Sequence, residues 1–240
     1  MKVLVTKKAI LKSDELHASK ETACVLTISV GQPNHEGDKL LATILAANKN
    51  FSSCIIMVCD SLQRHTMSID ANLSFKTLHA DSNKLGAEWI ERNLPAIHHF
   101  KIPYKISQWD DWLAHNDFIV KQDLITALYK NDLLFRKSID ETVAEFVSRK
   151  AKHTTFNINV ARKYSCDYLL EECAVMLLLA DCGYAFEIYP SQRNAAMSYV
   201  YQAIIAVNRP DLMRAVSIKF KNINNGGQTQ SLNFSIYTAI

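Results

Sequence analysis

A serine stands at the end of the first strongly apolar segment of the chain. Residues 24–29, CVLTIS, are rich in β-branched side chains, which predicts a buried strand. The loop GQPNHEG follows at 31–37, and its glycines and proline favour a tight turn. Ligands of open α/β sheets bind at the carboxyl ends of strands, so Ser29 is a candidate nucleophile. The structural alternative is that its hydroxyl satisfies backbone groups of the loop.

A second candidate pair lies in YSCDYLLEECAV, at 164–175. Tyr168 and Glu172 are four residues apart, so on a helix they lie on one face. A carboxylate beside a phenol can bind a cationic amine, because the first supplies charge and the second a hydrogen bond. Glu171 lies about 100° further round such a helix and is expected to face solvent. The alternative for the pair is an ordinary exposed glutamate near a core tyrosine.

A tyrosine also ends a later apolar segment, FEIYPS at 186–191. Pro190 stops the strand, which puts Tyr189 at the edge of the sheet. Strand alternation predicts that Glu187 and Tyr189 share one face, as Val25, Thr27 and Ser29 do. His35 is the only histidine near Ser29 in the sequence, and it is considered as a general base for that serine.

The elements that must position these residues alternate between strand and helix. The segment 24–29, a helix at 38–50 and a strand at 54–60 form a βαβ unit, which implies parallel strands. Further along, we expect a helix at 82–94, a strand at 101–107, two or three helices within 110–151, a helix at 160–182 closed by Gly183, a strand at 185–189, helices at 191–207 and 209–215, and a last strand at SIKF. The fold class is therefore α/β, a single Rossmann-like domain with a mostly parallel sheet flanked by helices. We expect an N-terminal extension at 1–22, the catalytic domain at 23–223 and a flexible tail at 224–240.

Composition and missing motifs narrow the function. The 240 residues carry a formal charge of +3, too small to indicate nucleic-acid binding by itself. There is no GxGxxG or GxxxxGK[ST] loop, no HExxH helix and no cysteine pair at metal-ligand spacing. The start has no continuous apolar segment typical of a signal peptide, and no stretch reaches the roughly 20 apolar residues that span a bilayer. We expect a cytoplasmic protein with reduced cysteines, no metal and no membrane partner.

Taken together, these residues resemble the tRNA-dependent cyclodipeptide synthases. In that family a serine closes the first strand of a Rossmann-like domain, a YxxxE pair follows on a helix, and a tyrosine then ends a strand. Ser29, Tyr168, Glu172 and Tyr189 stand in this order and spacing. Gln32, three residues after the serine, and the Tyr189-Pro190 pair are similar to the Tyr-Pro (XYP) branch of the family.

The resemblance implies a fold similar to the catalytic domains of class I tyrosyl- and tryptophanyl-tRNA synthetases, without ATP or another cofactor. It implies that a monomer uses two aminoacyl-tRNAs as substrates. Ser29 would carry the first aminoacyl group as an ester, and Tyr168 and Glu172 would hold its α-ammonium. Tyr189 would position groups or relay a proton while a dipeptidyl-enzyme closes to a diketopiperazine.

The tRNA-binding surface is less clear from the sequence. The other branch uses a strongly basic helix, whereas the matching stretch here balances Lys84 and Arg92 with Glu88 and Glu91. Basic residues gather instead between Arg149 and Cys166 and within 191–240. The first of these sets is the candidate tRNA surface: Arg149, Lys150, Lys152, Arg162 and Lys163.

The substrate pocket is expected beside the strand ends. Its candidate residues are Gln32, Pro190, Val25, Thr27, Met57, Cys59, Val175 and Glu187. Thr27 and Glu187 would favour a small or polar side chain over a bulky aliphatic one. Two other functions remain open: a serine-nucleophile acyltransferase or hydrolase that does not need tRNA, and a tRNA- or nucleotide-binding Rossmann module without catalysis.

Overall fold

The computed structural model describes residues 6–12, 20–71 and 73–223. Within them, six strands form one sheet in the order β1-β6-β5-β2-β3-β4. Their bounds are β1 (Lys7–Lys12), β2 (Ala23–Ile28), β3 (Ser53–Val58), β4 (Tyr104–Gln108), β5 (Phe186–Tyr189) and β6 (Arg214–Asn222). All neighbouring strands are parallel except β1, which pairs antiparallel with β6. The predicted mostly parallel α/β sheet is confirmed.

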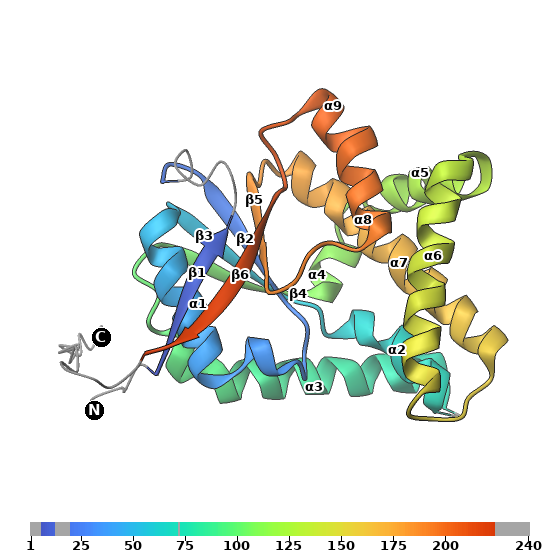
Figure 1. The fold of residues 1–240 in the computed structure, drawn as a ribbon, viewed down its shortest axis with the longest axis horizontal. Coiled ribbons are helices and arrows are strands. Elements are labelled where there is room, and N and C mark those ends of the chain that lie inside the picture. The colour runs from blue at the N-terminus through green and yellow to red at the C-terminus, as the bar shows by residue number, and fades with distance from the viewer. Residues whose placement is uncertain (1–5, 13–19, 72, 224–240) are drawn as a thin grey trace.

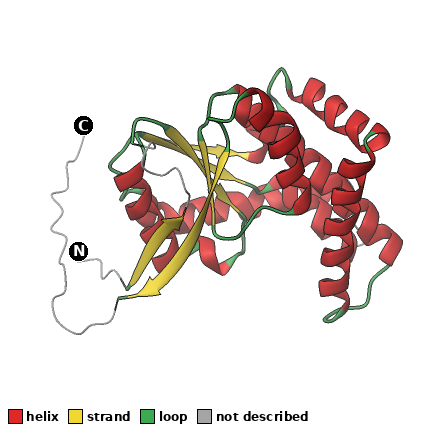
Figure 2. Ribbon diagram, turned by 45° about the horizontal axis from the view of Figure 1, so that its top comes forward, coloured by secondary structure: helices red, strands yellow, loops and turns green. Residues whose placement is uncertain are grey.

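Helices cover both faces of this sheet (Figures 1 and 2). They are α1 (Gly37–Asn50), α2 (Arg64–Asp70), α3 (Phe75–Ile97), α4 (Trp109–Leu113), α5 (Phe118–Asn131), α6 (Leu133–Ala151), α7 (Ile158–Asp181), α8 (Ala195–Val200) and α9 (Ala206–Asn208), with the short turns η2 (Pro33–His35) and η3 (Ser61–Gln63) and the π-helical turn η4 (Tyr201–Ile205). Helices α1 and α3 pack on one face, where Leu26 and Trp89 are buried. Helix α7 packs on the other with α2, α5, α6 and α8 around it.

Helix α7 is the central helix of the second layer. Asn157 caps its start by accepting hydrogen bonds from the amides of Asn159 and Val160 at 3.0 and 3.3 Å. Gly183, two residues after its end, has a φ of +83°, a left-handed conformation that favours glycine. The helix expected at 160–182 and its closing glycine are therefore confirmed, and the candidate pair Tyr168 and Glu172 lies on this helix.

Two segments differ from the sequence-based expectations. Residues 209–215 were expected to be helical, but β6 begins at Arg214 and runs to Asn222. Residues 7–12, within the expected N-terminal extension, form β1 and extend the sheet by pairing with β6. The expected flexible tail, 224–240, lies outside the described residues.

The connections reverse direction in the middle of the sheet. From β2 the chain moves outward through β3 to β4, and it then returns to β5 and β6 on the other side of β2. The carboxyl ends of β2 and β5 therefore flank the switch point, where doubly wound sheets bind their ligands. Ser29 follows β2 directly, and Tyr189 is the last residue of β5.

Candidate active site

Two hydroxyl groups meet at this switch point. The Oγ atom of Ser29 lies 3.1 Å from the phenolic oxygen of Tyr189, within hydrogen-bonding distance. Both residues are half-buried. Burial raises the pKa of Tyr189, with its contact to Ser29 opposing this, so the phenol stays neutral near pH 7. A neutral phenol at this position can donate a hydrogen bond to the serine or accept one from it.

His35 supports the backbone of Ser29 and not its hydroxyl. The amide N–H of Ser29 donates to Nδ1 of His35 at 2.6 Å, and the imidazole packs edge-on against Tyr189 with ring centroids 5.4 Å apart. Burial lowers the pKa of His35 to about 4, so the ring is neutral. This geometry does not support the interpretation of His35 as a general base for Ser29.

Tyr168 and Glu172 lie one turn apart on α7 and are both partly buried. Burial raises the pKa of Glu172 to about 8; the nearby charge of Glu187 adds to this, and a hydrogen bond from Asn194 opposes it. Burial and the charge of Glu172 also raise the pKa of Tyr168. A carboxyl group that is protonated at neutral pH is typical of functional sites, where such groups transfer protons or bind cations.

Asn194 links this carboxyl to the next helix. Its Nδ2 lies 3.4 Å from Oε2 of Glu172, while its Oδ1 accepts from the amide of Met197 at 2.8 Å and caps α8. An asparagine just before a helical segment is a capping signal, so this residue could have been found from the sequence.

Glu187 is paired and not open to the site. Its carboxylate accepts from Thr27 Oγ1 at 3.2 Å and from Arg193 Nε at 2.9 Å, and it is 5% exposed. The expected shared face of Glu187, Tyr189, Thr27 and Ser29 is consistent with these contacts and with the strand register. Arg193 was not singled out in the sequence, where nothing distinguishes it from other basic residues of the region.

The other candidate pocket residues are distributed around the same strand ends. Val25, Met57, Cys59 and Val175 belong to the buried cluster between the sheet and α7. Pro190 is half-buried, whereas Gln32 is exposed. The backbone N–H of Gln32 donates to the carbonyl oxygen of Ser29 at 3.2 Å. Their contribution to substrate binding stays a prediction.

The expectation for Glu171 is wrong. Its side chain is buried: Oε2 pairs with Arg64 and lies 3.2 Å from His65 Nε2, and Oε1 accepts from Trp109 Nε1 at 2.7 Å. Burial opposes its ionisation, but the hydrogen bond from His65 and the charge of Arg64 hold its pKa below the ordinary value. The helix has neighbours on this side too, namely α2 and α4, and they supply the partners.

Two of the five basic residues expected to bind tRNA already form ion pairs within the protein. Lys150 pairs with Asp70 at 2.5 Å, and Lys163 pairs with Asp167 at 2.8 Å. Arg149, Lys152 and Arg162 are exposed. In the described residues no group of His, Cys, Asp and Glu side chains could hold a metal ion, and no helix combines the length and apolarity needed to cross a membrane.

The class of protein is an α/β protein with a Rossmann-like sheet and with a serine and a tyrosine at its switch point. Comparisons with known proteins identify the family. A cyclodipeptide synthase (CDPS) from Fluoribacter dumoffii is 33% identical, with a TM-score of 0.87 over 91% of this chain and 99% of that one. The chain therefore belongs to the cyclodipeptide synthase family and is an enzyme. No family model and no curated protein sequence matches the chain.

More distant structures share the fold. A cyclodipeptide synthase from Candidatus Glomeribacter gigasporarum, solved bound to Phe-tRNAPhe, is 20% identical, with a TM-score of 0.68 over 92% of this chain and 94% of that one. A Mycobacterium tuberculosis protein is 11% identical, with a TM-score of 0.63 over 92% of this chain and 95% of that one. Its structure relates cyclodipeptide synthetases to type I tRNA synthetases.

Proposed function

We propose that this enzyme joins the aminoacyl groups of two aminoacyl-tRNAs into a cyclic dipeptide, through covalent intermediates on Ser29 and without ATP. The observation that carries the proposal is the hydroxyl pair of Ser29 and Tyr189, 3.1 Å apart at the switch point. Gln32 and Pro190 support assignment to the Tyr-Pro branch.

In the first transfer, Ser29 Oγ attacks the ester carbonyl of an aminoacyl-tRNA. The bond between that carbonyl and the ribose oxygen breaks, and the serine proton ends on the departing ribose hydroxyl. Tyr189 holds the serine hydroxyl in place, and its neutral phenol can relay this proton. Because the ester already stores the activation energy, the step consumes no ATP.

In the second transfer, the amine of the seryl-bound residue attacks the carbonyl of the second aminoacyl-tRNA and releases its tRNA. The amine must first lose its ammonium proton. Glu172, whose pKa is about 8, is ionised in a minority of molecules near neutral pH, and in that form its carboxylate accepts the proton. Tyr168 lies on the same helix face to hold the nitrogen. The new terminal amine then attacks the seryl ester, which forms the second peptide bond and regenerates Ser29. Holding both acyl groups in one site replaces encounters in solution, and effective molarities for such steps reach about 10⁵ M or more.

The test is expression in a bacterial host followed by mass spectrometry of the medium for cyclic dipeptides. The wild type should give a product that Ser29→Ala abolishes, while Ser52→Ala, a matched change at an exposed serine outside the site, leaves it unchanged. An undiminished product from Ser29→Ala would exclude Ser29 as the acyl carrier. Ser29-dependent hydrolysis of simple esters without tRNA, and no cyclic product, would favour the hydrolase alternative.

A further inference from the structure

The loop between β5 and α8, residues 190–194, has a contact with the candidate site at each end. Tyr189 lies directly before the loop, and its hydroxyl oxygen is 3.1 Å from Ser29 Oγ. Asn194 is the last residue of the loop, and its Nδ2 donates to Oε2 of Glu172 at 3.4 Å. The two contacts therefore reach different groups, the candidate acyl carrier and the candidate proton acceptor.

Only the second contact depends on the loop. Tyr189 is held by the sheet, because it is the last residue of β5, pairs with Ser217 of β6 and packs edge-on against His35. Asn194 lies outside the sheet and caps α8, a helix of six residues, by accepting from the amide of Met197 at 2.8 Å. The position of Asn194 is therefore set by whatever anchors the loop.

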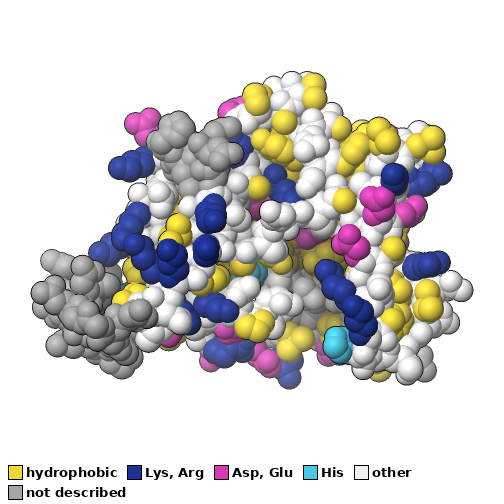
Figure 3. All heavy atoms as spheres, in the orientation of Figure 1, with side chains coloured by type: hydrophobic (Ala, Val, Ile, Leu, Met, Phe, Trp, Pro, Cys, Tyr) yellow, Lys and Arg dark blue, Asp and Glu magenta, His cyan; other side chains and the backbone are white. Residues whose placement is uncertain are grey.

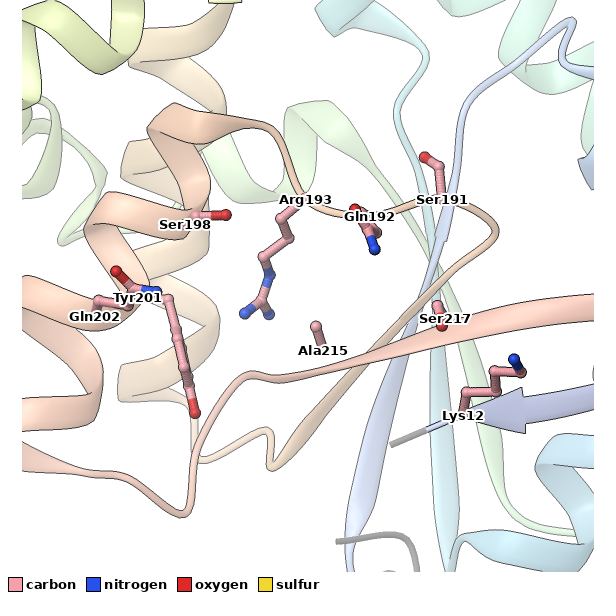
Figure 4. A pocket seen from close by; sticks show the side chains of 9 residues that line it. All are labelled: Lys12, Ser191, Gln192, Arg193, Ser198, Tyr201, Gln202, Ala215 and Ser217. Atoms are coloured by element: carbon pink, nitrogen blue, oxygen red, sulfur yellow. The ribbon is translucent and has the colours of Figure 1, made fainter. Parts of the chain in front are cut away.

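A cavity lies beside the middle of the loop. Figure 3 shows mostly uncharged side chains at the surface where the loop runs in Figure 1. Ser191 and Gln192 are exposed and line this cavity of about 330 Å³, together with Ser217 of β6 (Figure 4). Because open space lies next to these two loop residues, their packing does little to hold the loop in place.

Arg193 anchors the loop. It is the only charged residue of 190–194, and its side chain is 9% exposed. Its Nε donates to Oε2 of Glu187 on β5 at 2.9 Å, and its Nη2 donates to the carbonyl oxygen of Met213, directly before β6. The guanidinium also lies over the ring of Tyr201, 5.0 Å from the ring centroid (Figure 4). One planar cation thus connects the loop to β5, to the start of β6 and to η4.

Glu187, the acidic partner of Arg193, is itself held within the sheet. Its carboxylate is 5% exposed, and Oε1 accepts from Thr27 Oγ1 on β2 at 3.2 Å. Removing one partner of a buried ion pair leaves an uncompensated charge, which is strongly unfavourable. Movement of Arg193 away from Glu187 would have the same cost, so the ion pair resists displacement of the loop.

We propose that Arg193 and Asn194 are positioning residues for the second transfer: Arg193 anchors the loop, and Asn194 holds the carboxyl group of Glu172 in place to accept the proton of the amine. The inference rests on the proposed function, because it assigns supports to the proton acceptor of that reaction. The proton passes from the ammonium nitrogen to a carboxylate oxygen of Glu172, and the freed nitrogen lone pair attacks the second ester carbonyl.

The hydrogen bond from Asn194 favours this chemistry in two ways. It fixes one carboxyl oxygen of Glu172, and an N–H donor favours the ionised carboxylate, which is the form that accepts the proton. Ser29 takes no part in the hydrogen bonds of Arg193 or Asn194. The first transfer, on Ser29, should therefore proceed without either positioning residue.

The experiment measures the two transfers separately. The enzyme is rapidly mixed with a pool of bacterial aminoacyl-tRNAs, and intact-protein mass spectrometry follows the aminoacyl adduct on Ser29 while cyclic dipeptide is quantified. Asn194→Ser keeps an N-capping side chain for α8 but lacks the amide N–H that reaches Glu172. The double variant Arg193→Gln/Glu187→Gln removes the anchor without leaving a buried charge unpaired.

Both variants should form the adduct at the wild-type rate but convert it to cyclic dipeptide about 10–100-fold more slowly, since misplacing a reacting group by about 1 Å can cost about 10²-fold. The adduct should therefore accumulate, whereas a general loss of structure would slow both steps together. Arg193→Lys keeps the charge opposite Glu187 but not the planar fork, so it should slow the conversion less than the double variant does. Arg209→Gln/Asp211→Asn, a matched change of an exposed ion pair, should leave both rates unchanged.

Conversion of the adduct at the wild-type rate in Asn194→Ser, with circular dichroism showing a folded protein, would overturn the proposal. Equal slowing of both transfers in the folded variants would overturn it as well, because the two residues would then support the whole site and not the second transfer. Absence of any Ser29 adduct in the wild type would instead contradict the proposed function, so the two failures are distinguishable.

Discussion

Glu171 and Glu172 are neighbours in the sequence but have opposite electrostatic environments. Glu171 is ionised among Arg64, His65 and Trp109, whereas burial holds Glu172 protonated at neutral pH. The first joins α7 to α2 and α4, and the second faces the residues at the switch point. The two adjacent carboxyls thus differ in ionisation, and substitutions can separate their effects on stability.

Glu171→Gln should destabilise the protein. The change leaves the guanidinium of Arg64, itself buried, without its counter-charge, and breaking a buried pair on one side costs about 3–5 kcal/mol. Urea unfolding at neutral pH measures the loss. Glu172→Gln is the matched control at the next position and should not lower stability; equal stability of Glu171→Gln and wild type would contradict this role.

Glu172→Gln should alter how stability depends on pH. The pKa of Glu172 is raised from the ordinary 4.5 to about 8, so between these values the folded protein holds a proton that the unfolded chain releases. Stability contributed by this proton is therefore full below about pH 4.5 and is lost as the pH rises to about 8, by at most about 1.4 kcal/mol per unit. Urea unfolding at several pH values should show a flatter profile for Glu172→Gln. Parallel profiles for variant and wild type would contradict the raised pKa.

Much of the site could be predicted from the sequence because its residues end strands. Ser29 lies two residues before Gly31 and Tyr189 directly before Pro190, each at the end of an apolar segment. Parallel pairing of β2 with β5 then brings them together. Glu171 could not be predicted in this way. A single helix face explains Tyr168 and Glu172, but the partners of Glu171 come from positions 64, 65 and 109, and only the folded helix layer brings them near.

At the scale of the elements, the antiparallel pair of β1 and β6 was the hardest part to predict. In KKAILK, lysines at both ends obscure the alternation that buries Ala9, so the strand resembles a charged terminus. Residues 209–215 were expected to be helical because their apolar spacing is short and ambiguous, but Met213 and Arg214 hydrogen-bond to the carbonyls of Tyr184 and Ala185 and begin β6. Pairing with a distant segment overrode the local pattern.

Lys221→Glu should stabilise the antiparallel pair of β1 and β6. The substitution replaces a repulsive cross-strand pair with Lys8 by an attractive one, worth about 0.2–1 kcal/mol. Thermal unfolding measures this gain in stability. Lys219→Glu is the control, because Lys219 lies opposite Ile10 and not opposite a lysine. A Lys221→Glu variant no more stable than this control would contradict the prediction.

Gly86→Ala should be destabilising because α3 approaches η3 closely at this glycine. An added Cβ would lie 2.3 Å from the Cβ and Oδ2 atoms of Asp60, whose carboxylate accepts from the amides of Ser61 and Trp109. Forcing such a contact costs about 1–3 kcal/mol. Urea unfolding measures this loss of stability. Ala87→Gly on the same helix is the control that measures the effect of helix propensity alone. A variant as stable as the wild type would show that Asp60 can move freely.

At the scale of the whole molecule, the sheet and the helix layer around α7 both contribute residues to the candidate site at the switch point. The sheet supplies Ser29 and Tyr189 from strands that flank the switch point, and α7 supplies Tyr168 and Glu172 from the layer packed on that face. Strands β1 and β6 extend the sheet next to β5 and carry exposed lysines. The candidate nucleophile and the candidate amine-binding pair thus lie on one side of a single domain.

The central claim is that Ser29 carries the first aminoacyl group. Intact-protein mass spectrometry after rapid mixing with a pool of bacterial aminoacyl-tRNAs tests it directly, followed by proteolysis to locate the added mass. The account predicts an adduct of one amino-acid residue on the peptide containing Ser29, labile to hydroxylamine and missing in Ser29→Ala. An adduct on another residue, or cyclic dipeptide formation by Ser29→Ala at the wild-type rate, would contradict it.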